Sequence, residues 1–409
     1  MDMAKPKIRF KGYTDEWEQR ELEEIVERVT RKNQDLVSEL PLTISAQYGL
    51  IDQNEFFDKR VASKDVSGYY LIYNGEFAYN KSTSSDAPWG AIKRLDRYEK
   101  GVLSTLYIVF KIRDESVTSS DFLVTYYDTN NWHKDVQAIA AEGARNHGLL
   151  NIAPVDFFKT ELMLPQDIEE QRKIGDYFKS LNALITLHQR KCEQAKKLKK
   201  YMLQKMFPQN GQKVPEIRFK GFTDDWEQRK LGDFTWDAGK RNKEDLELEP
   251  YAITNEHGFI RQRDAHDDFG YMKDTDRKAY NIVQPNSFAY NPARINVGSI
   301  GYYKGVENVI VSSLYEVFQT DNYVNDRFLW HWLKSDEFPR WIEKLQEGSV
   351  RLYFYYDKLC ECQLYMPSLE EQEKIASFLD GLDHLITLHQ QKCDELKNIK
   401  KFMLQNMFM

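Results

Sequence analysis

The sequence predicts a mixed α+β fold in which two similar globular domains are separated by two long antiparallel coiled-coil helices, as a pseudo-two-fold internal repeat. Two sequence repeats support this prediction. Ile8 to Leu22 is identical to Ile217 to Leu231 at 12 of 15 positions, and residues 169–207 match residues 370–408 at 22 of 39 positions without a gap. The segments between these repeats diverge, so we expect two heads that share one fold and differ in surface.

The repeat borders set the predicted domain boundaries. Pro208-Gln209-Asn210-Gly211 follows the first long repeat and is a helix-breaking sequence. The predicted parts are a first globular domain at 1–166, a first long helix at 167–207, a linker at 208–215, a second globular domain at 216–367 and a second long helix at 368–409.

Both long segments show helical start signals and helical periodicity. Asp167 and Glu170, and likewise Ser368 and Glu371, have capping-box spacing. About 40 residues make a rod of roughly 60 Å, which is too long for one small domain to cover, so we expect the two helices to pair. An ordinary amphipathic helix lying on its own domain is the alternative. The predicted helix-pairing and partner-binding residues are Ile174, Leu181, Ile185, Cys192, Leu198 and Met202, with Ile375, Leu382, Ile386, Cys393, Ile399 and Met403.

Composition indicates folded domains in the cytoplasm. The chain is 41% hydrophobic and 13% aromatic, and no apolar run approaches the roughly 20 residues of a membrane span. The first ten residues lack the apolar core of a signal peptide. Four cysteines are too few for a disulfide framework, and they lack the spacing of a zinc site.

The net charge of −7 argues against DNA binding by the whole surface. Charge is unevenly distributed, however, because residues 169–207 hold 10 Lys and Arg against 4 Asp and Glu. Any DNA affinity must therefore come from local patches, or be shared with a basic partner.

Catalytic motifs are missing from the sequence. It contains no phosphate-binding loop, no Gly-x-Gly-x-x-Gly turn, no His-Glu-x-x-His pair and no nucleophile elbow. His266-Asp267-Asp268 reads as a solvated polar loop. Asn291-Pro292-Ala293-Arg294 begins like the Asn-Pro-Pro-aromatic motif of amino-methyltransferases, but Ala293 and Arg294 replace the second proline and the aromatic residue. We expect a structural turn there, with no catalytic residue, metal or cofactor in this chain.

The remaining chemistry is that of basic side chains, which hold phosphates and read base edges in DNA. For each one, a solvated surface charge is the competing interpretation. Lys81 with Arg294, and Arg145 with Arg351, rank highest because both halves retain the surrounding segments. The predicted DNA-binding residues are Arg28, Arg31, Lys32, Lys81, Arg94, Arg97 and Arg145 in the first head, and Lys240, Arg241, Arg261, Arg263, Arg294 and Arg351 in the second.

Taken together, these features resemble the specificity subunit of type I DNA restriction–modification systems. The resemblance is carried by the Phe-Lys-Gly-x-Thr-Asp-x-Trp-Glu-Gln-Arg segments at 10–20 and 219–229, the two Phe-Ala-Tyr-Asn segments, residues 291–299, and the Leu-Pro or Met-Pro that runs into Glu-Glu-Gln-x-Lys-Ile. It covers nearly the whole length. The first head departs from the family pattern at Asn80-Lys81-Ser82-Thr83.

The resemblance implies a non-catalytic subunit whose two heads read the two halves of a split, asymmetric target in double-stranded DNA. It implies two modification subunits, which use S-adenosylmethionine to methylate adenine, and two restriction subunits, which use ATP and magnesium. The alternative is a coiled-coil assembly scaffold without direct base readout.

Overall fold

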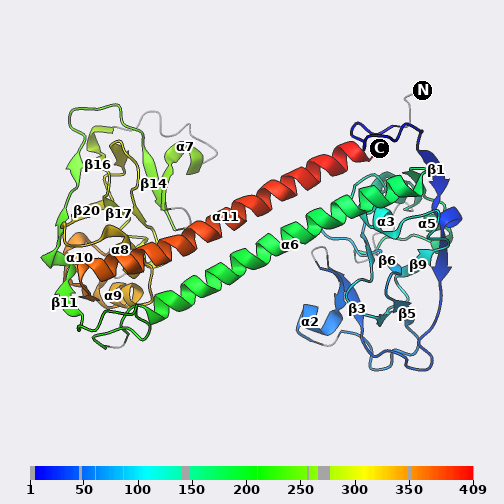
Figure 1. Cartoon of the computed structure of the whole chain (residues 1–409), viewed down its shortest axis with the longest axis horizontal. Coiled ribbons are helices and arrows are strands. Elements are labelled where there is room, and N and C mark those ends of the chain that lie inside the picture. The colour runs from blue at the N-terminus through cyan, green and yellow to red at the C-terminus, as the bar shows by residue number, and fades with distance from the viewer. Residues whose placement is uncertain are drawn as a thin grey trace. The chain divides into compact units, whose positions relative to one another are not determined.

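The computed structural model describes residues 5–45, 48–59, 61–85, 87–140, 148–209, 211–255, 258–265, 277–348 and 352–408. The chain forms two compact units (Figure 1). Unit 1 comprises Met1–His188 and Gln391–Met409, and unit 2 comprises Gln189–Gln390. Each unit therefore combines one globular head with parts of two long helices, α6 (Ile168–Lys205) and α11 (Leu369–Met407). The two long helices predicted from the sequence are present, within two residues of the predicted limits.

The first head is built from short strands and short helices. Its strands are β1 (Glu18–Glu21), β2 (Val26–Val29), β3 (Leu42–Ser45), β4 (Gly49–Asp52), β5 (Tyr70–Tyr73), β6 (Phe77–Asn80), β7 (Ala91–Arg94), β8 (Lys100–Leu103), β9 (Ile108–Ile112) and β10 (Glu161–Leu164). Its helices are α1 (Leu22–Ile25), α2 (Gln53–Phe57), α3 (Ser120–Tyr126), α4 (His133–Ile139) and α5 (Pro154–Phe158).

The second head repeats this plan with small differences. Its strands are β11 (Glu227–Lys230), β12 (Thr235–Asp237), β13 (Lys240–Arg241), β14 (Tyr251–Thr254), β15 (Gly258–Arg261), β16 (Asn281–Val283), β17 (Phe288–Tyr290), β18 (Ile300–Tyr302), β19 (Val309–Val311), β20 (Glu316–Thr320) and β21 (Gln363–Met366). Its helices are η1 (Leu231–Asp233), α7 (Gln262–Ala265), η3 (Arg277–Ala279), η4 (Ile295–Val297), α8 (Asp326–Leu333), α9 (Glu337–Leu345) and α10 (Tyr356–Glu361).

The Phe-Ala-Tyr-Asn repeat forms an inner strand of the main sheet in each head. The strand order is β2-β9-β6-β7 in the first head and β12-β20-β17-β18 in the second, and all pairs are antiparallel. Phe77 stacks on Phe110 at 5.3 Å, and Phe288 stacks on Phe318 at 4.9 Å. All four rings are fully buried, which explains why both halves retain these apolar residues.

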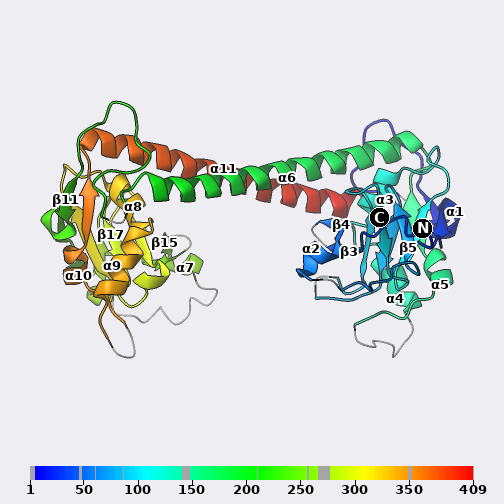
Figure 2. The same ribbon diagram turned by 90° about the horizontal axis from the view of Figure 1, so that it is seen from below.

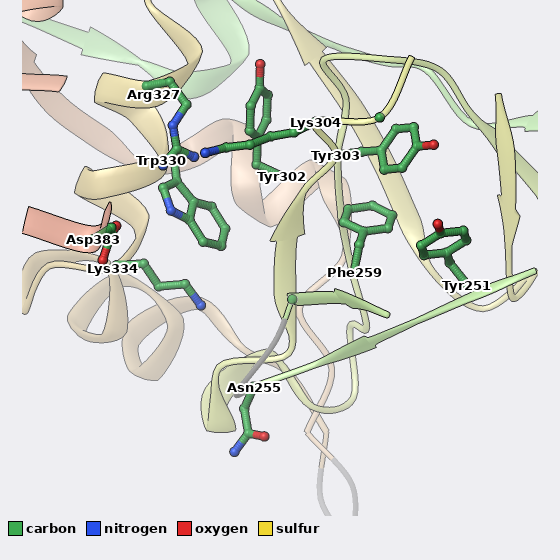
Figure 3. A pocket seen from close by; sticks show the side chains of 12 residues that line it. Tyr251, Asn255, Phe259, Tyr302, Tyr303, Lys304, Arg327, Trp330, Lys334 and Asp383 are labelled. Atoms are coloured by element: carbon green, nitrogen blue, oxygen red, sulfur yellow. The ribbon is translucent and has the colours of Figure 1, made fainter. Parts of the chain in front are cut away.

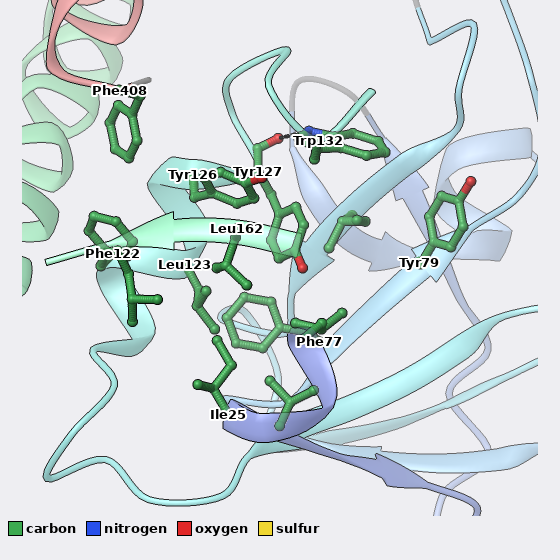
Figure 4. Close-up of a cluster of buried hydrophobic side chains, with 14 of the residues drawn as sticks. Ile25, Phe77, Tyr79, Phe122, Leu123, Tyr126, Tyr127, Trp132, Leu162 and Phe408 are labelled. Atoms are coloured by element: carbon green, nitrogen blue, oxygen red, sulfur yellow. Dashed lines mark hydrogen bonds between the residues drawn. The ribbon is translucent and has the colours of Figure 1, made fainter. Parts of the chain in front are cut away.

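The end of each long helix completes the core of the head from the other half of the sequence. In unit 1, Phe408 at the end of α11 lies within 6.4 Å of Trp17, Phe122, Tyr126 and Phe178, measured between ring centroids (Figure 4). In unit 2, Phe207 lies 5.3 Å from Phe328. The repeated Met-Phe at the end of each long helix therefore packs into the core of the head formed by the other half of the sequence.

Within unit 2 the two helices run antiparallel, since Cys192 contacts the carbonyl of Ile386 and Lys199 pairs with Asp383. In each unit the helix segments lie along one side of the head (Figure 2). Ile174, Leu181, Cys192, Ile375, Leu382 and Cys393 are buried, while Ile185, Met202, Ile386 and Met403 are half-buried. Among the described residues, no helix is long and apolar enough to cross a membrane.

Two members of the predicted pairing stripe are more exposed than the others. Leu198 and Ile399, which are equivalent in the repeat, are 41% and 36% exposed. A pair of straight helices buries a narrow strip, and spacing by three and four alone cannot separate that strip from its flank. Leu198 and Ile399 therefore lie at the edge of the buried strip, and their predicted part in helix pairing and partner binding stays a prediction.

The predicted capping boxes are also replaced by longer-range contacts. The Asp167 carboxylate accepts a hydrogen bond from the Glu169 amide, as an N-cap does. The Glu170 side chain, however, is 1% exposed and bonds to Arg9, and Glu371 bonds to Arg218 in the same way. This glutamate anchors the opening segment of each half to its helix.

The adjacent glutamine holds the helix α3 or α8 in place. The Gln171 side-chain oxygen accepts from the Ser119 amide, and the Gln372 oxygen accepts from the Asn325 amide, both at 2.9 Å. Ser119 and Asn325 are the N-caps of α3 and α8. The repeated Glu-Glu-Gln thus anchors the opening segment and one head helix to each long helix. The two heads are therefore attached to their long helices by the same contacts.

Candidate nucleic-acid interface

A pair of basic residues occupies the same place in each head. Arg31-Lys32 follows β2 in the first head, and Lys240-Arg241 forms β13 in the second, each 209 residues apart like the opening repeats. The next residue is Asn33 or Asn242, and both asparagines are fully buried.

The buried asparagine fixes the chain that follows each basic pair. The Asn33 amide donates to the Ser38 carbonyl at 2.8 Å, and its oxygen accepts from the Ser38 amide. Asn242 makes the same two bonds with Leu246. A buried side-chain amide whose nitrogen and oxygen are both hydrogen-bonded is held rigidly. The basic pair that precedes it in the chain therefore has a defined position.

In the first head the basic pair lies on aromatic faces. The Arg31 guanidinium is 4.5 Å from the Tyr73 ring and 2.7 Å from the Glu76 carboxylate. The Lys32 ammonium is 4.0 Å from the Tyr70 ring and donates to the Gly68 carbonyl. Both cations keep an exposed edge, which suits contacts to phosphate oxygens or base edges.

In the second head the pair is exposed and only one member is bonded. Arg241 donates to the carbonyls of Ala279 at 2.6 Å and Ser313 at 3.1 Å. Lys240 forms no ion pair or hydrogen bond with its side chain in the described parts of the chain. Its charge is available to a ligand.

The other predicted residues of the first head divide into exposed and engaged side chains. Arg28 on β2 and Arg97 in the turn after β7 are exposed. Lys81 points to the Ile152 carbonyl at 3.4 Å, and burial lowers its pKa. Arg94 is 14% exposed and binds the carboxylates of Asp96 and Asp121, so its guanidinium is committed to the fold.

In the second head, three predicted arginines lie on or beside the β14–β15 hairpin. Arg261 ends β15, and its pKa is raised chiefly by a hydrogen bond with the Tyr251 side chain. Arg263 lies 3.6 Å from the Glu249 carboxylate. Arg294 is exposed at the rim of a cavity of about 200 Å³, whose lining includes Asn255, Asn291 and Tyr315.

The Asn-Pro-Ala-Arg segment is a turn, as the sequence suggested. The Asn291 side-chain oxygen accepts from the Ala293 amide at 3.0 Å, and Asn80 makes the same bond to the Ser82 amide. This Asx-turn occupies the side chain that an amino-methyltransferase would use on a base. Arg145, Arg351 and His266-Asp267-Asp268 lie outside the described residues.

The structure brings Arg31 with Lys32, and Lys240 with Arg241, into equivalent, anchored positions. Arg94 instead forms ion pairs with Asp96 and Asp121 within the head. Sequence reasoning named the basic pairs singly and overlooked the buried asparagine beside each. The signal was available, because the basic-basic-Asn sequence recurs at the offset of the opening repeat.

One group of possible metal-ligating atoms occurs in the described ranges. His331, Asp380 and Asp383 bring ligand atoms within 4.8 Å of one another. Arg327 and His331 already bind Asp380, however, and Lys199 binds Asp383. Two cations neutralise both carboxylates, so this group is an ion-pair network that joins α8 to the long helices.

A second candidate surface is a row of exposed apolar residues on the long helices. On α6 it contains Leu184, Leu187, Leu198 and Tyr201, and on α11 the equivalent Leu385, Leu388, Ile399 and Phe402. All eight are between 36% and 55% exposed. Unit 1 holds Leu184 and Leu187 with Ile399 and Phe402, and unit 2 holds Leu198 and Tyr201 with Leu385 and Leu388; the two residues of each pair are three apart and share one helix face. We refer to these eight residues as the outer row.

Comparisons with known proteins agree with this architecture. Residues 223–398 match the family model described as "Type I restriction modification DNA specificity domain". The specificity subunit of the type I restriction enzyme MjaVIII of Methanocaldococcus jannaschii is 21% identical over 325 residues, covering 74% of this chain and 72% of that protein. The crystal structure of the type I restriction-modification S subunit from M. genitalium has a similar fold, with a TM-score of 0.63, 12% identity and 99% of each chain covered.

Proposed function

We propose that this chain is a specificity subunit of a type I restriction–modification system, and that its two heads read the two halves of a split, asymmetric sequence in double-stranded DNA. The observation that carries this proposal is that the two heads are attached in the same way and differ in their exposed residues. The ion pairs Arg9–Glu170 and Arg218–Glu371 join each opening segment to its long helix identically, whereas the exposed parts of the heads differ.

The anchored basic pairs are the proposed centre of each DNA contact. Arg31 and Lys32 in the first head, and Lys240 and Arg241 in the second, are held in position by buried asparagines. Their charge offsets a net charge of −7 only locally, which fits a subunit that shares phosphate contacts with its partners. The other predicted contacts that remain predictions are Arg28, Lys81, Arg97, Arg145, Arg261, Arg263, Arg294 and Arg351.

The outer row of the long helices is the proposed docking face for partner subunits. An exposed apolar row on each helix is unfavourable in water unless it is covered. By the family pattern, two modification subunits bind there and two restriction subunits join the full complex, in the cytoplasm. S-adenosylmethionine, ATP and magnesium then belong to those partners, and the flipped adenine enters the pocket of the modification subunit.

The second candidate function is an assembly scaffold without base readout. The outer row favours it as much as it favours the recognition function, because docking needs no DNA contact. The two candidates differ in what the heads do.

Exchange of one head distinguishes them. Residues 24–165 are replaced by the corresponding region of another specificity subunit, and the methylated sequence is read from cells that also express the modification subunit. Recognition predicts that one half of the methylated sequence changes and the other half stays. A change in both halves, or in neither, would contradict separate reading by the two heads.

A further inference from the structure

The second head contains a hollow of about 590 Å³ beside the β14–β15 hairpin (Figure 3). Tyr251 and Phe259 of the hairpin lie on one side together with Tyr303. Trp330 of α8 and Lys334, the C-cap of α8, lie on the other side, and Lys304 reaches in from the segment after β18. We call this hollow the aromatic pocket.

Three of its rings form one continuous apolar surface. The centroid of Tyr303 lies 5.9 Å from that of Tyr251 and 5.3 Å from that of Phe259, and Tyr251 lies 6.3 Å from Phe259. Trp330 is separate from this cluster and carries the Lys334 ammonium 4.7 Å from its ring. The pocket therefore offers flat faces on which a planar ring can stack.

Two of its cations have no counter-ion among the residues that the structure describes. Within the described ranges, neither Lys304 nor Lys334 forms an ion pair, and Lys334 has only the Gly298 carbonyl at 3.4 Å and the Trp330 ring. The other charges that face the pocket cancel in pairs, since Arg327 binds Asp380 and Lys199 binds Asp383. Burial lowers the pKa of both lysines, to about 8 at Lys334.

The first head lacks every one of these features at the equivalent positions. The repeat aligns 250–260 with 41–51, which places Leu42 and Leu50 where Tyr251 and Phe259 stand. The paired strands of the main sheets align Tyr303 with Leu95 and Lys304 with Asp96. The N-caps Ser119 and Asn325, which bond to the equivalent glutamines Gln171 and Gln372, are equivalent positions. This alignment places Val124 at the position of Trp330 and Asp128 at that of Lys334.

The charge difference is a reversal. Asp96 binds Arg94 at 2.6 Å, and Asp128 binds Lys93 at 2.7 Å and Lys400 at 2.8 Å. In the first head both aspartates are therefore ion-paired, while in the second head Lys304 and Lys334 have no ion-pair partner within the described ranges. Tyr303 is a buried core residue with Tyr251 and Phe259 packed against it, and the half-buried Tyr251, Phe259 and Trp330 also line the hollow. Lys304 is exposed and Lys334 is half-buried, so a bound anion would stabilise chiefly the Lys334 ammonium.

From this arrangement we infer that the aromatic pocket binds a nucleotide, with the base against the half-buried Tyr251, Phe259 and Trp330 rings and the phosphate at Lys304 and Lys334. The nucleotide is either one unit of a DNA strand or a free mononucleotide. The DNA source rests on the proposed function of the second head, and the free source does not.

The test uses the purified full-length chain and two probes, dAMP and a short fluorescein-labelled oligothymidylate. Lys304→Gln and Lys334→Gln each remove one phosphate contact, and each is expected to weaken binding about tenfold. Phe259→Leu gives the residue of the first head and is expected to weaken binding through lost stacking while the core stays filled. Lys344→Gln is the matched control, because Lys344 lies 4.8 Å from the Trp341 ring outside the pocket.

Saturable dAMP binding with this variant pattern would establish a site for free nucleotides. Binding of the oligothymidylate alone, with the same pattern, would identify the DNA strand as the source. No saturable binding of either probe, or binding that both glutamine variants leave unchanged, would overturn the inference. Duplex binding by the complex with its modification subunit, measured on the same preparations, separates the two proposals. If the wild-type complex lacks sequence-specific binding, the proposed function fails; if that binding persists and the variants are silent, only the pocket fails.

Discussion

The guanidinium of Arg9 donates two hydrogen bonds, of 2.6 and 2.7 Å, to the carboxylate of Glu170, 161 residues further along the chain. Glu170 is 1% exposed at the start of α6. Arg218 and Glu371 make the same paired bonds, of 2.7 and 2.8 Å, at the start of α11. This bidentate pair explains why the opening segment and the helix start are the two parts that both halves retain.

Breaking this pair should destabilise unit 1. Arg9→Met leaves the Glu170 carboxylate buried without a partner, which costs about 3–5 kcal/mol for a buried pair. Arg9→Met with Glu170→Met should recover part of that loss, as measured by urea unfolding. Arg20→Met is the control in the same segment, since its partners Glu18 and Glu24 are on the surface and contribute little. Equal losses for Arg9→Met and Arg20→Met would argue against a structural role for the pair.

The ion pairs that join head to helix have opposite polarity in the two units. In unit 1 the head residue Asp121 binds Lys179 of α6, and in unit 2 the head residue Arg327 binds Asp380 of α11. Asp380→Lys should therefore destabilise unit 2 by repulsion from Arg327. Adding Arg327→Asp should restore stability, with a coupling energy between about 0.5 and 3 kcal/mol in a double-mutant cycle. The exposed pair of Lys374 and Glu370 is the control, and its reversal should show no such coupling.

Lys334 should make unit 2 sensitive to pH. Burial lowers its pKa to about 8, below the ordinary value of 10.5. Between these two values the unfolded chain binds more protons than the folded chain, so this group adds stability as the pH rises through that range. Lys334→Met should therefore be more stable than the wild type near pH 7, by roughly 0.5–2 kcal/mol, and the advantage should vanish above about pH 10.5. An advantage that stays constant with pH would assign the effect to packing.

The outer row should be needed for assembly and dispensable for folding. Leu184→Ser with Leu187→Ser changes two residues that are 43% and 45% exposed, so the thermal midpoint should stay close to that of the wild type. Copurification with the modification subunit should be lost. Leu181→Ser is the contrast, because Leu181 is buried and its loss should lower the midpoint itself. Retained copurification by the double variant would mean that the partners dock elsewhere.

The repeated segments allowed the fold to be predicted because they carry strong, local signals. Apolar spacing by three and four over nearly 40 residues specifies a helix, and the repeat shows that it occurs twice. The buried strand residues Phe77 and Phe288 are similarly plain in the sequence. The exposure of Leu198 and Ile399 was beyond reach, because it depends on the direction from which the second helix packs.

The site was harder to predict, since its parts come from distant segments. The partner of Glu170 is Arg9 rather than the local amide, and no spacing rule reveals a contact across 161 residues. Arg94 was predicted to contact DNA, but in the folded head its guanidinium pairs with the Asp121 carboxylate, which is 27 residues away in the sequence. The aromatic pocket combines a hairpin, a strand end and a helix, and Phe259, Lys304 and Lys334 meet only in the folded head.

Single-molecule sequencing of DNA from cells that express this chain with its cognate modification subunit is the most direct test of the recognition function. The expected result is a split motif that carries methyl-adenine in both halves. The contradictory result is a stable complex on a sizing column with no new methylation, which would show that the heads do not read DNA and would leave the scaffold function in its place.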